Sequence, residues 1–491
     1  MILVGLLTSL FLTSMLIMLV SQFFKAISAW MAALAMLIAL LMMFMLYQDV
    51  MAPFANISFY APWIKALNIN FHLMLSPLSF WLILLSLFMG LLAIINSPSE
   101  KPASYYAALC LSVMALIGIF LASDVFLFFI FWELALFPMY FLLSRNSHQD
   151  DASVLLRYII YTQVSGLILL LSILGLVIAH YDMTGIMTFD YQALKSIPLP
   201  LTTQKVLFLG FALAFAIKLP LVPFHTWLLA LMTKSEVPVI LIGVLIKSSV
   251  FGLMLFSWPL FPDACSDFAV PLMAAGLFSL LYGAIMALAQ NDPRKVVGFF
   301  VVSHMGFMFM GINASAHQSF LGLAILMIAQ ACSTGGLVLI LEYLRRSDLG
   351  ITIADYQGLW ARAPKASFFL FSFFLASIGT PLFGNFIGEW LVILAIFKQS
   401  VFMALGASLG IVLSAAYCLW LFQRLCFSNK DQVDHKKTDV KTAEMVLGGA
   451  CLVILLILGL YPSALTDSIT PAHNPPLSQT QEHMEQKAGS V

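Results

Sequence analysis

Charged side chains are scarce in this sequence. Only 9% of its 491 residues are Asp, Glu, Lys or Arg, whereas 62% are hydrophobic. A soluble globular chain is roughly a quarter charged, because its surface must be covered by polar groups. The shortage excludes a soluble protein and predicts an all-α polytopic membrane protein. The 23 basic residues balance 23 acidic ones, so no nucleic-acid partner is expected.

The sequence also lacks motifs for covalent chemistry. No CxxC pair, Gly-rich phosphate loop, His/Cys cluster or nucleophile–base arrangement occurs in it. The six cysteines stand alone in apolar runs, which is typical of small buried side chains. We therefore expect no metal and no cofactor, and a chain that moves ions without changing bonds. The cysteines are Cys110, Cys265, Cys332, Cys418, Cys426 and Cys451.

Long apolar runs, in contrast, are abundant. A helix needs roughly 20 apolar residues to cross the hydrocarbon core, and cutting the chain at polar or proline-marked breaks gives about 14 such runs. The predicted spans are 2–24, 26–47, 73–95, 103–122, 124–143, 154–180, 206–230, 236–260, 269–290, 296–312, 318–343, 367–396, 401–422 and 444–462.

The loop charges orient these spans. Sixteen Lys and Arg residues follow odd-numbered spans and five follow even-numbered ones. Because basic loops stay on the cytoplasmic side, this bias places both termini on the outer side. The stretch from Thr466 to Val491 is rich in Pro, Gln, Ser and Glu, so we expect a solvated, poorly ordered tail.

Five titratable residues lie in the middle of predicted spans. An ionisable group at bilayer depth costs at least ~2.5 kcal/mol and marks a functional site by default. A structural ion pair or a side chain that reaches the interface is the alternative for any one of them. Five such groups on different spans instead favour a proton relay in the bundle interior. They are Glu133, Lys218, Lys247, His304 and Glu389.

Helix-breaking residues accompany two of these charges. Lys218 is followed by Pro220 and Pro223, and Glu389 is preceded by Pro381 and Gly384. Interrupted spans in corresponding positions indicate an inverted-repeat transporter with its sites at the breaks. The two breaks are five spans apart, which predicts two five-helix repeats of opposite topology.

This reasoning divides the chain into five segments. We expect an N-terminal three-helix segment, a first repeat, a second inverted repeat, a C-terminal helix and the polar tail. Their predicted ranges are 1–102, 103–260, 261–428, 429–466 and 467–491.

Several strings in the sequence resemble one known family. The strings stand in the order expected for that family. Through them the sequence resembles the antiporter-like M (chain-4) subunits of proton-pumping NADH:quinone oxidoreductase, respiratory complex I. The acid in the GEW string favours the M subunits over the L and N subunits and the Mrp antiporters. The YTQ-SGL string also favours the M subunits. The strings are FWELALFPMYFL (131–142), YIIYTQVSGL (158–167), KLPLVPFHTWL (218–228), YGAIMALAQNDPRKVV (282–297), SHMGF (303–307), GNFIGEW (384–390) and LGLYPSALTD (458–467).

The resemblance implies roles for the buried charges. Glu133 would tune the proton affinity of Lys218, Lys247 and His304 would pass protons along a central axis, and Glu389 would connect that axis to the outer side. It also implies a bacterial inner-membrane location, neighbouring L- and N-type membrane-arm subunits as partners, and electron transfer in other subunits of the complex.

Three departures from the family pattern keep alternatives open. The segment 229–238 reads LALMTKSEVP, Gln330 stands where a histidine is expected, and Ser76 stands where an acid is expected. Gln330 can hold water but cannot titrate, so it is a candidate polar relay. The alternatives are an Mrp-like cation/proton antiporter subunit, or a membrane subunit of a hydrogenase or an inorganic-carbon-accumulating complex.

Overall fold

The structure is a computed structural model of the chain. It describes residues 1–20, 27–52, 57–98, 100–144, 152–196, 198–243, 245, 247–314, 317–346, 352–427 and 439–473. The predicted tail beyond residue 473 lies outside the described residues.

The described residues are overwhelmingly helical. The long and broken helices of the bundle are α1 (Ile2–Val20), α2 (Ser28–Met45), α4 (Pro77–Ile95), α5 (Ala103–Leu121), α6 (Val125–Leu134), α7 (Leu136–Ser144), α8 (Ala152–Thr184), α10 (Leu201–Lys218), α11 (Thr226–Lys234), α12 (Val237–Gly243), α13 (Lys247–Leu260), α14 (Pro262–Leu288), α15 (Pro293–Asn313), α16 (His317–Arg346), α18 (Pro364–Ser377), α19 (Gly384–Gln399), α20 (Val401–Cys426) and α21 (Thr442–Leu460). Short connecting elements are α3 (Tyr47–Met51), β1 (Ile57–Ile64), β2 (Ile69–Leu75), α9 (Tyr191–Lys195), α17 (Leu359–Arg362) and α22 (Ser463–His473).

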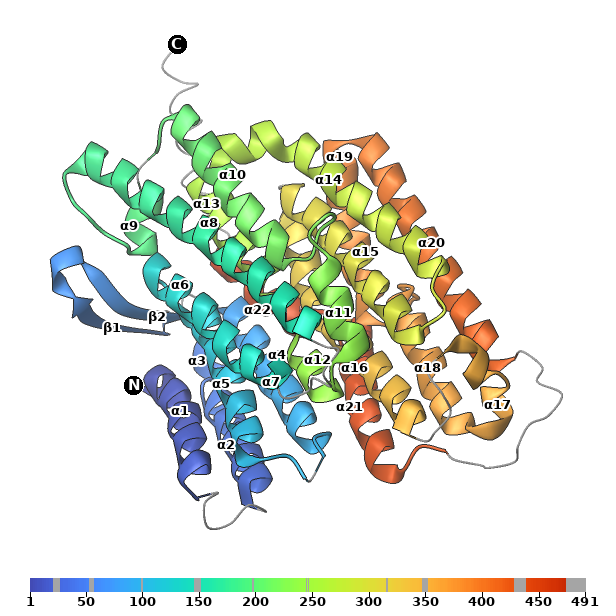
Figure 1. Cartoon of the computed structure of the whole chain (residues 1–491). Coiled ribbons are helices and arrows are strands. Elements are labelled where there is room, and N and C mark those ends of the chain that lie inside the picture. The colour runs from blue at the N-terminus through green and yellow to red at the C-terminus, as the bar shows by residue number, and fades with distance from the viewer. Residues whose placement is uncertain are drawn as a thin grey trace.

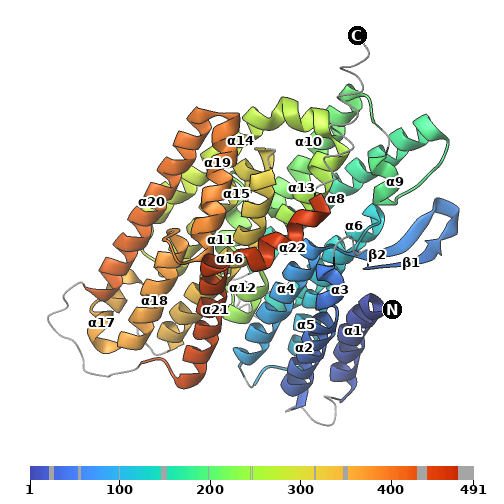
Figure 2. The same cartoon turned by 180° about the vertical axis from the view of Figure 1, so that it is seen from behind.

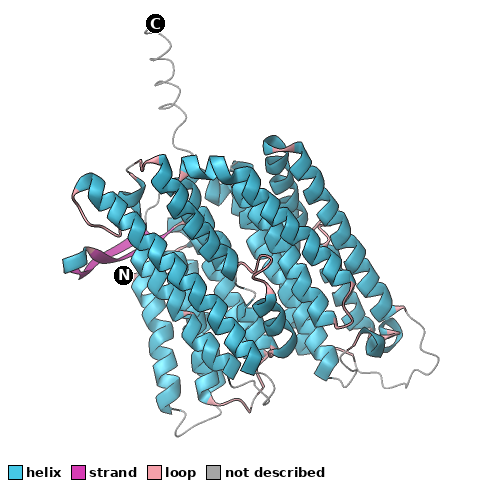
Figure 3. Cartoon of the chain, turned by 45° about the horizontal axis from the view of Figure 1, so that its top comes forward, coloured by secondary structure: helices cyan, strands magenta, loops and turns pink. Residues whose placement is uncertain are grey.

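The predicted polytopic all-α architecture is confirmed. Among the described residues, 13 helices are long and apolar enough to cross a membrane. The remaining predicted span, 367–396, is divided into α18 and α19, each shorter than a full crossing. The helices run side by side through the molecule (Figure 3).

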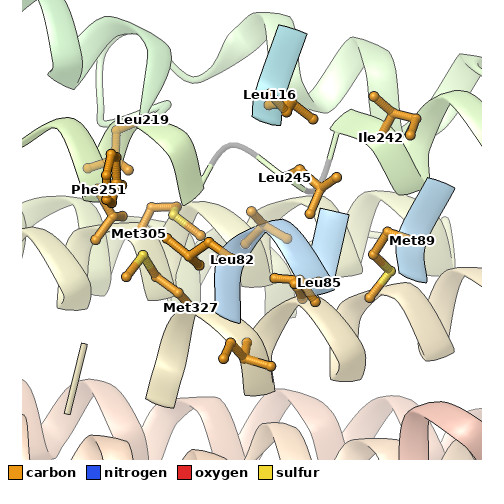
Figure 4. Packing of buried hydrophobic residues seen from close by; sticks show 14 of the residues in the cluster. Leu82, Leu85, Met89, Leu116, Leu219, Ile242, Leu245, Phe251, Met305 and Met327 are labelled. Atoms are coloured by element: carbon orange, nitrogen blue, oxygen red, sulfur yellow. The ribbon is translucent and has the colours of Figure 1, made fainter. Parts of the chain in front are cut away.

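The most buried helices lie at the centre of the bundle. Nearly every residue of α15 is buried, as is most of α16. Helix α15 packs along α14, and α16 packs along α19, α18 and α21. Helices α1 and α2, drawn in blue at one edge of the bundle (Figure 1), bury only a third of their length. Hydrophobic side chains fill the interior between α4, α13, α15 and α16 (Figure 4).

Two elements differ from the sequence-based expectation. Strands β1 and β2 form an antiparallel hairpin, which projects from one edge of the bundle (Figures 1 and 3). It takes in residues 73–75, which the apolar run predicts to be the start of the third span. Strand β1 alternates between half-buried and exposed positions from Ile57 to Pro62, a period of two that suits a half-buried strand, whereas every residue of β2 is buried or half-buried.

Helix α22 also occupies the start of the predicted polar tail. Leu465 and Ile469 are buried, and Trp81 Nε1 donates a hydrogen bond to Ser468 Oγ (2.9 Å). The helix forms because this apolar pair, four residues apart, packs on α4 and α16. Figure 2 shows it crossing the bundle. The expectation of an unstructured tail is therefore wrong for residues 466–473.

Candidate functional site

The first acid and the first lysine of the predicted relay lie at helix ends. Glu133 is the penultimate residue of α6, and Lys218 is the last residue of α10. The C-terminal end of a helix carries partial negative charge and stabilises a cation there. The two side chains interact electrostatically, but no direct ion pair joins them within the described part of the chain.

The carboxylate of Glu133 is pressed against a neighbouring helix. A Cβ atom added at Gly166 of α8 would collide with Glu133 Oε1. That oxygen is buried and accepts no hydrogen bond from any described residue. Because Gly166 has no side chain, the carboxylate can reach the interior beside α8.

A small cavity lies beside Lys218. It has a volume of about 50 Å³, and its lining includes Lys218 and Ser248, the residue after Lys247. A water molecule needs roughly 10–15 Å³ of such space, so the cavity has room for a few. The further polar side chains in its wall are Ser112, Tyr158 and Thr162. Leu116, Ile242 and Leu245 of its wall are labelled in Figure 4.

Lys247 is the most isolated of the buried charges. It is the first residue of α13, is 1% exposed, and its Nζ has no hydrogen-bond partner among the described residues. A buried ammonium without a carboxylate is costly, which argues against a purely structural role.

Two fully buried amides lie on the helices beyond Lys247. Gln330 on α16 and Asn385 on α19 are 0% exposed, and within the described ranges neither amide nitrogen nor amide oxygen of either has a partner. These two helices pack along each other. Buried amides without protein partners are normally satisfied by water, so this interface favours hydration.

The last pair of the predicted relay is in contact. His304 Nε2 lies 3.5 Å from Glu389 Oε1, and both side chains are buried. On the other edge of the ring, His304 Nδ1 donates to the carbonyl oxygen of Phe300 (3.2 Å). Nδ1 therefore carries a proton in either charge state, and Nε2 gains one only in the imidazolium form. Protonation of His304 converts this contact into an ion pair with Glu389.

A glycine also lies against the second acid. Gly379 has a φ of +73°, and an added Cβ there would meet Glu389 Oε2. It lies in the non-helical segment between α18 and α19, together with Pro381, and Gly384 begins α19. Each acid of the axis is thus accommodated by a glycine on another element or segment.

The structure places the remaining helix-break residues beside Lys218. Pro220 and Pro223 lie in the non-helical segment 219–225, between α10 and α11. Helices α6 and α7 adjoin at Ala135, two residues after Glu133, and the backbone of Ala135 itself has helical φ and ψ angles. Helix α13 begins at Lys247, and residues 244 and 246 before it lie outside the described part of the chain. Lys218 and Glu389 therefore lie beside helix breaks, as the Pro and Gly residues near them predict.

Ion pairs tie the loop ends of the bundle together. Lys101 pairs with Glu236, and Arg294 pairs with Glu342, which also accepts a hydrogen bond from Arg346 (3.1 Å). Arg294 further donates to the carbonyl oxygen of Ser235 (3.2 Å). These contacts hold the loops beside α12, α15 and α16 in place.

A polar cluster fixes the hairpin at the start of α6. His72 Nδ1 donates to Asp190 Oδ2 (2.6 Å), while Asp124 caps α6 and accepts from the Asn70 backbone N–H (3.1 Å). Burial disfavours the charged form of Asp190, but the hydrogen bond from His72 and those from backbone N–H groups outweigh it and lower the pKa of Asp190 below its usual value.

Sequence reasoning missed several polar contributors. Asn385 lies within the quoted GNFIGEW string, but a neutral amide does not stand out as a charge does. Gly166 carries no chemical signal of its own, because its importance depends on a carboxylate from another part of the chain. Gly379 is identified from the sequence as one of the helix-breaking residues before Glu389, but its contact with that carboxylate is not.

The chain is similar in sequence and in fold to known membrane proteins. The family described as NADH:quinone oxidoreductase/Mrp antiporter, TM matches residues 122–414. Subunit M of NADH-quinone oxidoreductase from Pseudomonas aeruginosa is 34% identical over 90% of this chain and 91% of its own length. The corresponding subunit of Escherichia coli K12 is 35% identical over 83% and 82%.

A solved structure has the same fold. A chain of respiratory complex I from Thermus thermophilus superposes with a TM-score of 0.86 at 26% identity, covering 96% of this chain and 98% of that one. With the family match over more than half of the sequence, these likenesses identify the chain as a member of the NADH:quinone oxidoreductase/Mrp antiporter family, similar to its M subunits along most of its length.

Proposed function

We propose that this chain is the proton-translocating M subunit of the membrane arm of an NADH:quinone oxidoreductase. It moves protons through its buried polar axis, while electron transfer takes place in other subunits of the complex. This chain contributes no redox centre. Its partners are the neighbouring L- and N-type antiporter-like subunits, protons and the surrounding lipid.

The proposed path follows the buried groups in order. Lys218 exchanges a proton with water in the cavity, and Lys247 receives it at the far side. Water held by Gln330 and Asn385 carries the proton on to His304, and Glu389 accepts it from the imidazolium. Each lysine becomes a neutral amine when it gives up its proton, and His304 returns to the neutral imidazole.

Glu133 sets when Lys218 releases its proton. A carboxylate near an ammonium favours the charged form, whereas a low-dielectric surrounding disfavours it. Movement of Glu133 towards or away from Lys218 therefore shifts the lysine between holding and releasing a proton. The junction of α6 and α7 at Ala135, two residues after Glu133, is where we place such movement.

The observation that carries the proposal is the cavity shared by Lys218 and the residue next to Lys247. A structural ion pair would bring opposite charges together, but here Lys218 faces a cavity whose wall carries the hydroxyl groups of Tyr158, Thr162 and Ser248. The His304–Glu389 contact at the other end supplies an acceptor of suitable chemistry.

We further propose that the two interrupted regions belong to two inverted five-helix repeats, 103–260 and 261–428. In this arrangement Lys218 and Glu389 occupy corresponding breaks, and both termini face the outer side of a bacterial inner membrane. Loops with many basic residues then face the cytoplasm, in keeping with their sixteen-to-five bias.

NADH-driven acidification of inverted membrane vesicles tests the function. We expect Lys218→Ala to leave the complex assembled but to reduce acidification and quinone reduction together. The matched control is Lys398→Ala, because Lys398 is exposed and its Nζ donates a hydrogen bond to Gln318 Oε1 (3.0 Å). Normal acidification with Lys218→Ala at wild-type assembly would contradict the proposal.

A further inference from the structure

The ammonium of Lys218 lies on the face of a tryptophan. Its Nζ is 3.5 Å from the centroid of the Trp132 ring, well within the roughly 6 Å over which an aromatic face attracts a cation. No described carboxylate forms an ion pair with this lysine. The ring face therefore adds to the negative potential that the C-terminal end of α10 already provides at Lys218.

The Trp132 ring is held rigidly in this position. It is fully buried, stacks on Phe128 with a centroid distance of 5.7 Å, and meets the edge of Phe215 at 5.2 Å. Phe256 in turn packs against Phe128 at 4.8 Å. These contacts come from α6, α10 and α13, so the packing of three helices fixes the plane of the indole.

The chemistry of this contact depends on charge. The negative face of an aromatic ring attracts an ammonium but not a neutral amine, and the attraction is stronger in a desolvated site. Tryptophan has the strongest such face among the aromatic residues. Contact with Trp132 therefore stabilises Lys218 in its protonated form only.

The position of the Trp132 ring keeps the Lys218 ammonium from forming a direct ion pair with Glu133. Trp132 and Glu133 are consecutive on α6, so their side chains point in different directions around the helix. Lys218 is flexible along its four-carbon stem and already lines the cavity in the position over the ring. A direct carboxylate pair would hold the proton more tightly than the ring does.

We propose that Trp132 is a positioning residue that holds the protonated side chain of Lys218 beside the cavity and apart from Glu133. This inference rests on the proposed proton-transfer function. When Lys218 gives its proton to water in the cavity, the neutral amine loses its attraction to the ring, and reprotonation restores the contact. Trp132 thus sets the pH range in which Lys218 can cycle.

Site-specific replacement of Trp132 by mono-, di-, tri- and tetrafluorinated tryptophan tests this role in the assembled complex. Successive fluorines weaken the negative face of the ring while the side chain keeps nearly the same shape. We expect the alkaline limb of acidification against pH to move stepwise to lower pH, by about one unit in total, a tenfold change in the protonation equilibrium.

Fluorination of Trp258 is the matched control. Its indole donates a hydrogen bond to the carbonyl oxygen of Ile312 (3.0 Å) and does not face Lys218. We expect its fluorinated forms to follow the wild-type pH profile. A Trp132 series that also follows the wild-type profile would overturn the inference.

The Lys218→Ala variant separates this inference from the function on which it rests. Loss of acidification with Lys218→Ala, combined with no effect of fluorination at Trp132, would reject only the role of the ring. Normal acidification with Lys218→Ala would reject the relay itself. Trp132→Leu adds a large perturbation, but the fluorinated series decides the question even if that variant fails to assemble.

Discussion

At the scale of single residues, the buried charges differ in what surrounds them. His304 and Glu389 face each other, Lys218 lies over an aromatic ring, and Lys247 has no hydrogen-bond partner in the described residues. Stabilisation of the fold would favour close ion pairs or apolar replacements at all these positions. The observed spread of environments instead suits groups that must gain and lose protons.

Glu389→Gln tests the outer end of the axis. The amide keeps the size of the side chain but cannot accept the proton of His304. We expect normal assembly with acidification reduced about tenfold or more, since a barrier increase of only ~1.4 kcal/mol gives that factor. Acidification and assembly measured on the same vesicles check it, and wild-type acidification would remove Glu389 from the path.

Asp190 predicts a pH-dependent contribution to stability. Because its pKa is lowered in the folded protein, its contribution is complete above the unfolded value, near ~3.9, and is lost as the pH falls through the folded value. Asp190→Asn should therefore lower the thermal unfolding midpoint at neutral pH, and the difference from the wild type should shrink below pH ~4.

The matched control for Asp190→Asn is Asp182→Asn, since Asp182 is exposed on α8. It should leave the unfolding midpoint close to that of the wild type throughout. A difference between Asp190→Asn and the wild type that persists unchanged into acid would show that the His72–Asp190 contact does not stabilise the hairpin electrostatically.

At the scale of helices, function is concentrated where regular structure stops. Lys218 ends α10, Lys247 begins α13, Glu133 precedes the end of α6, and Glu389 follows the break before α19. An interrupted helix frees backbone groups that must be satisfied by side chains or water. The breaks after Lys218 and before Glu389 therefore leave backbone groups beside the titratable side chains that water or other side chains can satisfy.

Gly166→Ala tests one of these close approaches. The added methyl group would displace the Glu133 carboxylate, so we expect impaired acidification although no ionisable group has been changed. Gly449→Ala is the control, because a Cβ there meets nothing within 4 Å and alanine stabilises a helix by up to ~1 kcal/mol. Equal activity of the two variants would show that the position of Glu133 is not critical.

At the scale of the whole molecule, the sequence predicted the spans well because each needs only a long apolar run. It also predicted the breaks near Lys218 and Glu389, where Pro220, Pro223 and Pro381 interrupt the pattern. The junction of α6 and α7 at Ala135, beside Glu133, carries no proline, and nothing in the sequence marks it.

Contacts between distant segments were the least predictable part of the site. The approach of Trp132 to Lys218 and of Gly166 to Glu133 depends on how α6, α8 and α10 are arranged. Helix α22 was missed for a similar reason. It is short and mostly polar, and only its packing on α4 and α16 makes its two buried apolar residues sufficient to order it.

Lys247→Met provides the most direct test of the central claim, a continuous relay through the buried axis. Lys247 forms no ion pair in the described structure, and methionine fills similar space without the desolvation cost of a charge, so the fold should be retained or stabilised. The quantity to measure is the number of protons moved per NADH oxidised by the assembled complex in vesicles. We predict a lower ratio or a matching loss of turnover, whereas wild-type values for both would contradict the relay.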